Sequence, residues 1–471
     1  AFSTQMSVTA SDQTVYAGGI VGQAESSTIT DLNPTLAGNS IAVHAQGADG
    51  GGNAWAGGLV GSLANKSALK GADATLKAHT ASTAATAQNA YAGGAIGTAD
   101  SSSVSSLNPT VSSDSFAVSA QSADGGGKAL TGGLIGSLSN ASTLDDSNAT
   151  FKAQTASVTA NAIANAYAGG LAGQADRSSL SSSNPVFGRG SFTVSAQGDA
   201  GWGAGYAGGT IGQATSSSVA SLTQTVDGTS GDAALSIDAT ANSSRAGGFA
   251  GDVTGANKGI GLAFDTLALA SGSHSANLEV GSGNTLHAAG FIGWLSNTEM
   301  ANCALSSDNV TTGASKVTLN QRTYSPASGM VAVGERSSIK RSFVEANIAS
   351  QTASGIGFFF GSDQSDRKTT ISDCAAIGIV SGAKAYGFTV DQAKDQSRGG
   401  ILAYAPNKIS NSYAAVKVDS DATDAQLADF CEMNTDWRGT STPPENLSNC
   451  ATAGTKNTDL GSTRARTTGR L

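Results

Sequence analysis

Short apolar runs separated by Ser, Thr, Gly and Asn recur along the whole chain, and they are of three kinds. The first is a Gly-Gly-apolar-apolar-Gly element such as 57–61, the second a Ser-rich run such as Ser103–Leu107, and the third a run such as Ser115–Gln121. In the last two, apolar and polar residues alternate with period two, which is typical of a strand with one buried face. Clusters of Gly and Asn-Pro between the runs predict turns. We therefore predict three strands per unit, with no helical periodicity between them.

The Gly-Gly element returns at regular intervals and defines a repeat. Its second glycine recurs with spacings of 39, 36, 39, 37, 39, 39, 42 and 39 residues, and then of 28 and 30. A period of this size is the signature of a repeat architecture, in which each unit packs against its neighbours. The marker positions are Gly19, Gly58, Gly94, Gly133, Gly170, Gly209, Gly248, Gly290, Gly329, Gly357 and Gly387.

Three strands per unit favour one coil of a parallel β-helix (a β-solenoid), in which each strand pairs with its equivalent in the next coil at about 4.8 Å. About ten coils would then span roughly 50 Å. A first alternative is two shorter coils per unit. A second is a propeller, which is disfavoured because units of 28–30 residues are too short for four strands with their turns.

The repeats predict a solenoid over residues 1–418, with units of 36–42 residues to about 328 and of 28–30 residues after it. Residues 419–471 lose the repeat, and we interpret them as a C-terminal cap that covers the unpaired strands of the last coil. At the other end, residues 2–8 resemble the third strand of a unit. We expect that first coil to be completed by upstream residues or covered by a neighbouring subunit or by solvent.

Composition supports an ordered, exported chain. The 471 residues include 61 Gly but only 7 Pro, and 13% are charged, whereas disordered chains are normally rich in charge and Pro. The net charge is −9 and no basic stripe with interleaved aromatics occurs, so nucleic acid is not an expected partner. No apolar run approaches the roughly 18 residues of a membrane span. Neither a signal peptide at Ala1 nor an LPxTG-type sorting signal is visible, so export is inferred from composition and repeats.

The late units share a short motif. Residues 337–343 read Ser-Ser-Ile-Lys-Arg-Ser-Phe, 369–375 read Thr-Thr-Ile-Ser-Asp-Cys-Ala, and 407–414 read Asn-Lys-Ile-Ser-Asn-Ser-Tyr-Ala. Together with the Gly-Gly elements, this pattern resembles the GLUG-motif repeats of bacterial surface proteins over roughly residues 16–418. The resemblance implies a right-handed parallel β-helix of the kind found in exported adhesins and in accessory regions of some secreted peptidases. The 39-residue spacing is longer than the usual GLUG unit, and several units lack the Ile-x-Asn-Ser-Tyr part.

The resemblance also places two of the four cysteines. Cys303, Ser342, Cys374 and Ser412 each lie three residues after Met300, Ile339, Ile371 and Ile409, so stacked units would align them in one ladder. Cys303 and Cys374 would then be two layers, about 9.6 Å, apart. A disulfide needs Cα atoms within about 7 Å, so we predict that these two are unbridged, buried thiols.

The other two cysteines lie in the region interpreted as a cap. Cys431 and Cys450 enclose a short polar loop with Trp437, Pro443 and Pro444. Such a loop is a natural site for a disulfide in an oxidising compartment, and we predict a Cys431–Cys450 bridge there.

Catalytic motifs are sparse. The histidines His44, His79, His274 and His287 share no motif, and neither His-Glu-x-x-His nor Cys-x-x-Cys occurs. One charged set follows the first strand of late units and could gather on one side of a solenoid. Carboxylates and basic residues of this kind serve some β-helix enzymes that act on acidic polysaccharides, sometimes with calcium. The alternative, which we favour, is a set of solvated turns. The set comprises Asp363, Asp366, Arg367, Asp391 and Asp395.

An aromatic residue precedes the Gly-Gly element in five units: Tyr16, Trp55, Tyr91, Tyr167 and Tyr206. Stacked aromatics can bind sugar faces, but a ladder more often stabilises the stack itself. The sequence therefore indicates a non-catalytic extracellular adhesin, or a structural component of a fibre or pilus, at a bacterial surface. Its expected partners are a surface glycan, a surface protein or neighbouring subunits. The alternative is a secreted polysaccharide lyase or hydrolase.

Overall fold

A computed structural model describes most of the repeat region and short pieces of the C-terminal part. The described residues are 4–9, 14–47, 52–123, 126–188, 190–199, 201, 203–227, 232–255, 276–281, 285–306, 316–320, 327–350, 355–357, 359–364, 369–381, 384–386, 403–404, 408–419, 434–435, 441–442, 447–448 and 451–452. These residues form strands and turns, and none of them is helical.

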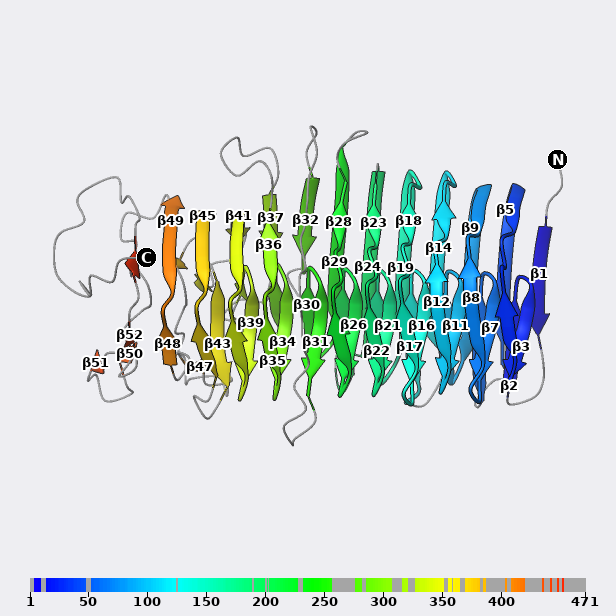
Figure 1. The fold of residues 1–471 in the computed structure, drawn as a ribbon, viewed down its shortest axis with the longest axis horizontal. Helices are drawn as coiled ribbons and strands as arrows, with labels where there is room; N and C mark the ends of the chain where they lie inside the picture. The colour runs from blue at the N-terminus through cyan, green and yellow to red at the C-terminus, as the bar shows by residue number, and fades with distance from the viewer. Residues whose placement is uncertain are drawn as a thin grey trace.

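The strands stack into a rod with β1 at one end and β49 near the other (Figure 1). The coils build four sheets, which we number 1 to 4 in the order in which the chain passes through a coil. Most described coils contribute one strand to each of sheets 1 to 3 and one or two strands to sheet 4. Almost all pairings are parallel and join equivalent residues of successive units. The protein is therefore an all-β parallel β-solenoid, as predicted.

Sheets 1 and 2 are formed by the two halves of the Gly-Gly element. Sheet 1 contains β2 (Thr14–Gly18), β6 (Asn53–Gly57), β10 (Asn89–Gly93), β15 (Lys128–Gly132), β20 (Asn165–Gly169), β25 (Ala204–Gly208), β30 (Ser243–Gly247), β33 (His287–Ala289), β38 (Ala327–Ser328), β42 (Gly355–Gly357) and β46 (Lys384–Tyr386). Sheet 2 contains β3 (Val21–Glu25), β7 (Val60–Ala64), β11 (Ile96–Asp100), β16 (Ile135–Ser139), β21 (Ala172–Asp176), β26 (Ile211–Thr215), β31 (Ala250–Thr254), β34 (Ile292–Ser296), β39 (Val331–Glu335), β43 (Phe360–Gln364) and β47 (Ala403–Tyr404).

Sheet 3 has short strands, and its described residues form an early set of six strands and a late set of five. Its strands are β4 (Thr28–Thr30), β8 (Ala68–Ala72), β12 (Ser103–Leu107), β17 (Thr143–Asp145), β22 (Ser179–Ser181) and β27 (Ser218–Ala220), and then β35 (Glu299–Ala301), β40 (Ser338–Lys340), β44 (Thr370–Ser372), β48 (Lys408–Ser410) and β52 (Leu447–Ser448).

Sheet 4 is the longest, and several coils enter it with two strands in succession. Its strands are β1 (Thr4–Thr9), β5 (Thr35–Gln46), β9 (Thr75–Ala87), β13 (Thr110–Val111), β14 (Ser115–Ser122), β18 (Thr150–Phe151), β19 (Thr155–Asn161), β23 (Val186–Phe187), β24 (Gly190–Gln197), β28 (Thr225–Val226), β29 (Ala233–Thr240), β32 (Ala276–Val280), β36 (Ala304–Ser306), β37 (Lys316–Leu319), β41 (Phe343–Ser350), β45 (Ala375–Ser381), β49 (Tyr413–Asp419) and β53 (Ala451–Thr452).

The register makes one unit equal to one coil. Gly18 pairs with Gly57, and Gly57 with Gly93, which reproduces the spacings of 39 and 36 residues. Both alternatives, two coils per unit and a propeller, are therefore wrong. The coil count differs slightly from ten, because sheets 1 and 2 each contain eleven strands in the described residues. The late marker is also displaced by one residue, since Gly357 pairs with Ser328.

The prediction of three strands per unit is wrong because the Gly-Gly element bends and divides into two strands. A Cβ atom added to Gly18 would lie 1.8 Å from the carbonyl oxygen of Val21 in the same bend. A Cβ added to Gly58 would lie 2.1 Å from the carbonyl oxygen of Gly94 in the next coil. The backbone thus approaches itself too closely for any side chain, both within a coil and between coils.

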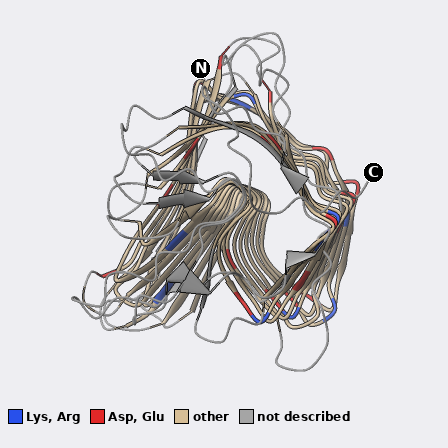
Figure 2. Ribbon diagram, turned by 90° about the vertical axis from the view of Figure 1, so that its left-hand side faces the viewer, with Lys and Arg blue, Asp and Glu red and all other residues tan. Residues whose placement is uncertain are grey.

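Alternating side chains fill the interior. On β14, Phe116, Val118 and Ala120 point inward and are each at most 2% exposed, and the residues between them face outward. Phe151 and Phe187 stack with centroids 5.6 Å apart, which adds contact between successive coils. Figure 2 looks along the rod and shows most charged positions at the corners of the cross-section, with mainly uncharged ribbon between them.

Strand pairing continues past residue 418, so the solenoid does not stop where the repeat was predicted to end. β52 pairs with β48 and β53 with β49, both parallel and in the register of the preceding coils. A separate antiparallel pair joins β50 (Asn434–Thr435) to β51 (Ser441–Thr442). The described residues include no helix with the length and hydropathy of a membrane span.

Candidate functional site

The aromatic residues of sheet 1 lie in one column. Tyr16, Trp55 and Tyr91 stack with ring centroids 4.7 and 5.5 Å apart and with 11° between successive planes. Tyr167 and Tyr206 form a second pair at 5.4 Å, and a leucine occupies the coil between the two groups. Burial raises the pKa of Tyr91 and of Tyr167, and Tyr167 is only 5% exposed. The ring faces are used between coils, which favours a stabilising role over a ligand platform.

Arg245 continues this column in the seventh coil. Its guanidinium lies 5.2 Å from the Tyr206 ring centroid on one coil and 4.0 Å from that of Trp294 on another, and it contacts the carboxylate of Asp252. The two charged side chains are 17% and 1% exposed, and burial lowers the pKa of Arg245. Arg245 therefore replaces an aromatic ring by stacking its planar cation on the neighbouring rings.

Asp252 in turn ends a row of amides on sheet 2. The Gln174 amide donates to the Gln213 side-chain oxygen at 2.9 Å, and Gln213 donates to Asp252 at 3.4 Å. Thr254 also donates to Asp252, at 3.0 Å. The carboxylate is thus held by an ion pair and two hydrogen bonds inside the protein. This is a structural ion pair, which the sequence analysis did not find.

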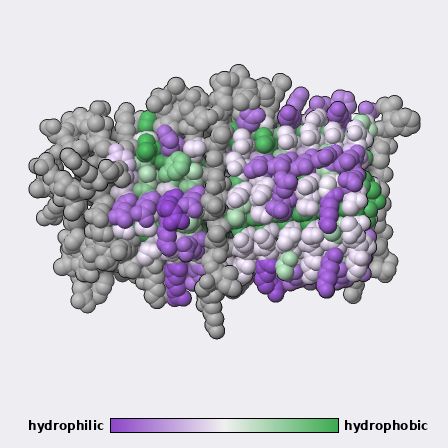
Figure 3. All heavy atoms as spheres, in the orientation of Figure 1, coloured by the Kyte–Doolittle hydropathy of each residue, from purple (hydrophilic) through white to green (hydrophobic). Residues whose placement is uncertain are grey.

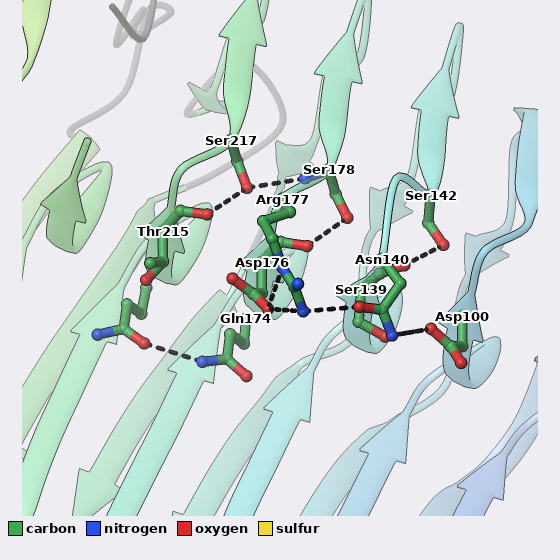
Figure 4. A network of polar contacts seen from close by, with 11 residues as sticks. Asp100, Ser139, Asn140, Ser142, Gln174, Asp176, Arg177, Ser178, Thr215 and Ser217 are labelled. Atoms are coloured by element: carbon green, nitrogen blue, oxygen red, sulfur yellow. Dashed lines mark hydrogen bonds and ion pairs between the residues drawn. The ribbon is translucent and has the colours of Figure 1, made fainter. Parts of the chain in front are cut away.

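Serine hydroxyls join the coils at the corner between sheets 2 and 3 (Figure 4). Ser142 donates to the carbonyl of Ser139 at 2.7 Å and accepts the backbone N–H of Ser102 from the preceding coil at 3.0 Å. Ser178 and Ser217 repeat the arrangement, with an N–H to hydroxyl distance of 3.0 Å. The residues just before these serines have positive φ, which turns the chain sharply. These hydroxyls are fully used by the fold.

Replacing Ser142 with Ala should lower the free energy of unfolding by about 1–3 kcal/mol, because the buried N–H of Ser102 loses its acceptor. The matched control is Ser103→Ala, whose outward hydroxyl makes no hydrogen bond in the described structure and whose loss should change stability by less than about 0.5 kcal/mol. Equal effects of the two variants in chemical denaturation would contradict the role assigned to the corner serines.

The corner between sheets 3 and 4 contains the cysteine ladder. Met300 pairs with Ile339, which pairs with Ile371, which pairs with Ile409, so the predicted alignment of the following turns is present. The N–H of Cys303 donates to Ser342 at 3.1 Å, and the N–H of Cys374 donates to Ser412 at 3.3 Å. Both cysteines are buried thiols outside any disulfide.

Cys374 should be chemically inert in the folded protein. Burial raises its pKa to about 12, so the thiolate needed for alkylation is scarce at pH 8. We expect iodoacetamide to label Cys374 only after unfolding, whereas an outward Ser103→Cys control is labelled at once. Peptide mass spectrometry reads both sites, and comparable labelling of the two in the native state would contradict the burial.

A third polar ladder runs beside this corner through the early coils. Asn33 accepts the N–H of Asp73 at 2.8 Å, and Asn108 donates to Asp73 at 3.0 Å and accepts the N–H of Asn148 at 2.9 Å. Asn184 then donates to Asn148 at 2.9 Å. Five successive coils are joined by side chains that could otherwise serve as ligands.

The structure does not test the predicted charged set as a group, because only one of its five residues is described. Asp363 lies on β43, where it pairs with Gly334 and with Tyr404. Asp366, Arg367, Asp391 and Asp395 lie outside the described residues, as do Cys431 and Cys450 with their predicted bridge. No group of three or more metal-binding side chains occurs in the part that the structure describes.

The three described histidines do not converge. His44 and His79 face outward on neighbouring strands of sheet 4, and His79 bonds Asp114 at 2.5 Å on the surface. His287 is buried on sheet 1, with its ring centroid 5.4 Å from that of Trp294. His274 lies outside the described residues.

The outer face of sheet 4 differs from these ladders. From β5 to β24, four columns of outward side chains run along the second half of the strands. In the column that starts at Ser40, Thr80 and Thr155 donate to backbone carbonyls at 3.3 and 3.4 Å. The side chains of the other three columns make no hydrogen bond within the described part of the chain, although the Oδ1 atom of Asn161 is buried. Figure 3 shows side chains of similar hydropathy lined up in rows along the rod. These three columns are Ala42, Ser82, Ala117, Ser157 and Thr193; His44, Ala84, Ser119, Thr159 and Ser195; and Gln46, Thr86, Gln121, Asn161 and Gln197.

Comparison with known proteins adds no family to this description. The chain matches no family model, no curated protein and no solved structure. The class of protein that the geometry defines is therefore the fold itself, a parallel β-solenoid.

The ion pair could have been found in the sequence by aligning one unit with the next. Tyr206 and Gln213 are followed 39 residues later by Arg245 and Asp252, so two columns change to opposite charges in the same unit. The corner serines gave no such signal, because serine is common throughout the chain.

Proposed function

We propose that this chain is a non-catalytic module of an extracellular bacterial surface protein, which holds a lateral binding face away from the cell as an adhesin or fibre component. One observation carries the proposal. Many polar side chains are committed to ladders between coils, whereas three columns on the outer face of sheet 4 make no side-chain hydrogen bond to the rest of the described chain. The likeness of the late units to GLUG repeats supports an exported, adhesive role.

A solenoid suits this role because its coils extend one surface by a fixed step. Each coil contacts only its neighbours, so length and binding area grow together. The described residues contain no group of three or more His, Cys, Asp or Glu side chains that could hold a metal ion, so they offer no such cluster of candidate acids and bases.

The test is incubation of the purified chain with neutral and acidic polysaccharides, with and without calcium, followed by measurement of bound protein and of polymer length. We expect binding without shortening of any polymer. Cleavage that disappears in Asp366→Asn or Asp395→Asn would replace the proposal with the alternative of a polysaccharide-degrading enzyme.

A further inference from the structure

Three columns on the outer face of sheet 4 from β5 to β24 form a regular array, and their side chains make no hydrogen bond to the rest of the described chain. Most of their polar groups are exposed, and the Oδ1 atom of Asn161 is buried. Ser119, Thr159 and Ser195 are direct neighbours along one column, and each is at least partly exposed. The adjacent column contains Gln121, Asn161 and Gln197 in the same three coils. These hydroxyls and amides can both donate and accept hydrogen bonds.

The charge of this face points to an uncharged partner. The whole chain has a net charge of −9, yet the three columns contain no Asp, Glu, Lys or Arg. A partner recognised through charge would need ionic groups opposite its own, and these columns have none between β5 and β24. The outward charges Lys77 and Asp238 of the same sheet lie outside them.

The heights of the side chains and the spacing of the coils both favour a polymer that lies along the rod. Columns repeat at about 4.8 Å along the axis and lie about 6.6–6.8 Å apart across it. The first two columns include the short side chains of Ala42, Ala84 and Ala117. The third column includes the longer side chains of Gln121 and Gln197, which project further along one side. This difference in height disfavours binding to ice, because an ice lattice plane needs a flat surface. It suits a polymer chain that lies on the short side chains and contacts the amides at its side.

We propose that this face binds an uncharged polysaccharide that lies parallel to the solenoid axis. Sugar C–H faces pack on the alanine methyl groups, and sugar hydroxyls exchange hydrogen bonds with the serine, threonine and amide groups. Contacts repeat in every coil, so several weak contacts combine along one polymer chain. The inference rests on the proposed function and adds to it the position and the ligand class of the binding face.

The test uses two matched triple substitutions in the full chain. One is Ser119→Glu, Thr159→Glu and Ser195→Glu on the proposed face. The control is Ser103→Glu, Thr143→Glu and Ser179→Glu, which are neighbouring outward positions of the same residue types on sheet 3. Glutamate places a hydrated charge where the polymer must sit, and stripping that hydration is unfavourable.

Binding is measured to immobilised mixed-linkage β-glucan, galactomannan and arabinoxylan, with polygalacturonate as the acidic comparison. We expect at least one neutral polymer to bind with little dependence on salt, a loss of at least tenfold in the sheet 4 variant, and less than a twofold change in the control. Circular dichroism confirms that both variants are folded.

Three results would overturn the inference: no neutral polymer bound, equal binding by both variants, or binding of polygalacturonate alone. Ice shaping or concentration-dependent self-association that only the sheet 4 variant loses would reassign the face to ice or to a second copy. None of these results requires polymer cleavage, so the inference can fail while the non-catalytic proposal stands.

Discussion

Replacing Asp252 with Ala should lower the free energy of unfolding by about 3–5 kcal/mol, because it leaves the buried Arg245 guanidinium without its counter-charge. The Nε atom of Arg245 already has no hydrogen-bond partner among the described residues, and Glu335, which also interacts electrostatically with the guanidinium, would compensate its charge only in part. Each coil contacts only its neighbours, and the loss should therefore weaken one junction and separate denaturant unfolding into two transitions. Chemical denaturation followed by circular dichroism and tryptophan fluorescence measures both effects.

The matched control restores the pattern of the preceding coils. The double variant Arg245→Tyr with Asp252→Gln copies Tyr206 and Gln213, and it should be within about 1 kcal/mol of the parent or more stable, because a buried ion pair can be replaced by well-packed neutral groups. If the double variant were as unstable as Asp252→Ala, the intact ion pair would itself stabilise the fold. The cost of Asp252→Ala would then not come only from leaving Arg245 unpaired.

Replacing Gly170 with Ala should cost about 3 kcal/mol, because the new methyl group would lie 2.0 Å from the carbonyl oxygen of Gly209 and 2.6 Å from the ring of Phe187. The backbone oxygen cannot move without disturbing the pairing of two coils. Thermal unfolding of the variant measures the cost, as a lowered midpoint.

Gly188 gives the control within the same coil. A methyl group there would meet its nearest atom, the carbonyl oxygen of Phe151, at an ordinary 3.4 Å, so Gly188→Ala should change stability by less than about 0.5 kcal/mol. If Gly170→Ala were as well tolerated as Gly188→Ala, the close approach of the coils would be disproved.

Much of the fold could be predicted because the repeat and the alternation are both visible in the sequence. The β12 strand has the predicted bounds Ser103–Leu107, and β14 extends the predicted run Ser115–Gln121 by one residue. The division of the Gly-Gly element could not be read in this way, because its two strands are joined by a bend of about two residues that resembles a continuous apolar run. Only the backbone distances at Gly18 and Gly58 show why the chain must turn there.

The candidate site was less accessible to prediction. The aromatic positions were visible because rings recur at a fixed place, but their relation to Arg245 and Trp294 depends on contacts between sheets that no local pattern reports. The binding face was missed for a different reason. Serines of the buried corner and serines of the open face look alike in the sequence, and only the hydrogen bonds of Ser142 distinguish it from Ser119.

The stacking of one unit on the next is tested most directly by cross-linking equivalent positions. Ser103 and Thr143 pair across adjacent coils, whereas Ser103 and Ser179 are separated by two. We predict that the variant Ser103→Cys with Thr143→Cys forms a disulfide under mild oxidation, and that Ser103→Cys with Ser179→Cys does not, because about 9.6 Å exceeds the Cα separation that a disulfide can bridge. Mass spectrometry of the linked peptides that showed equal yields, or a higher yield in the second variant, would contradict the solenoid and the ladders that depend on it.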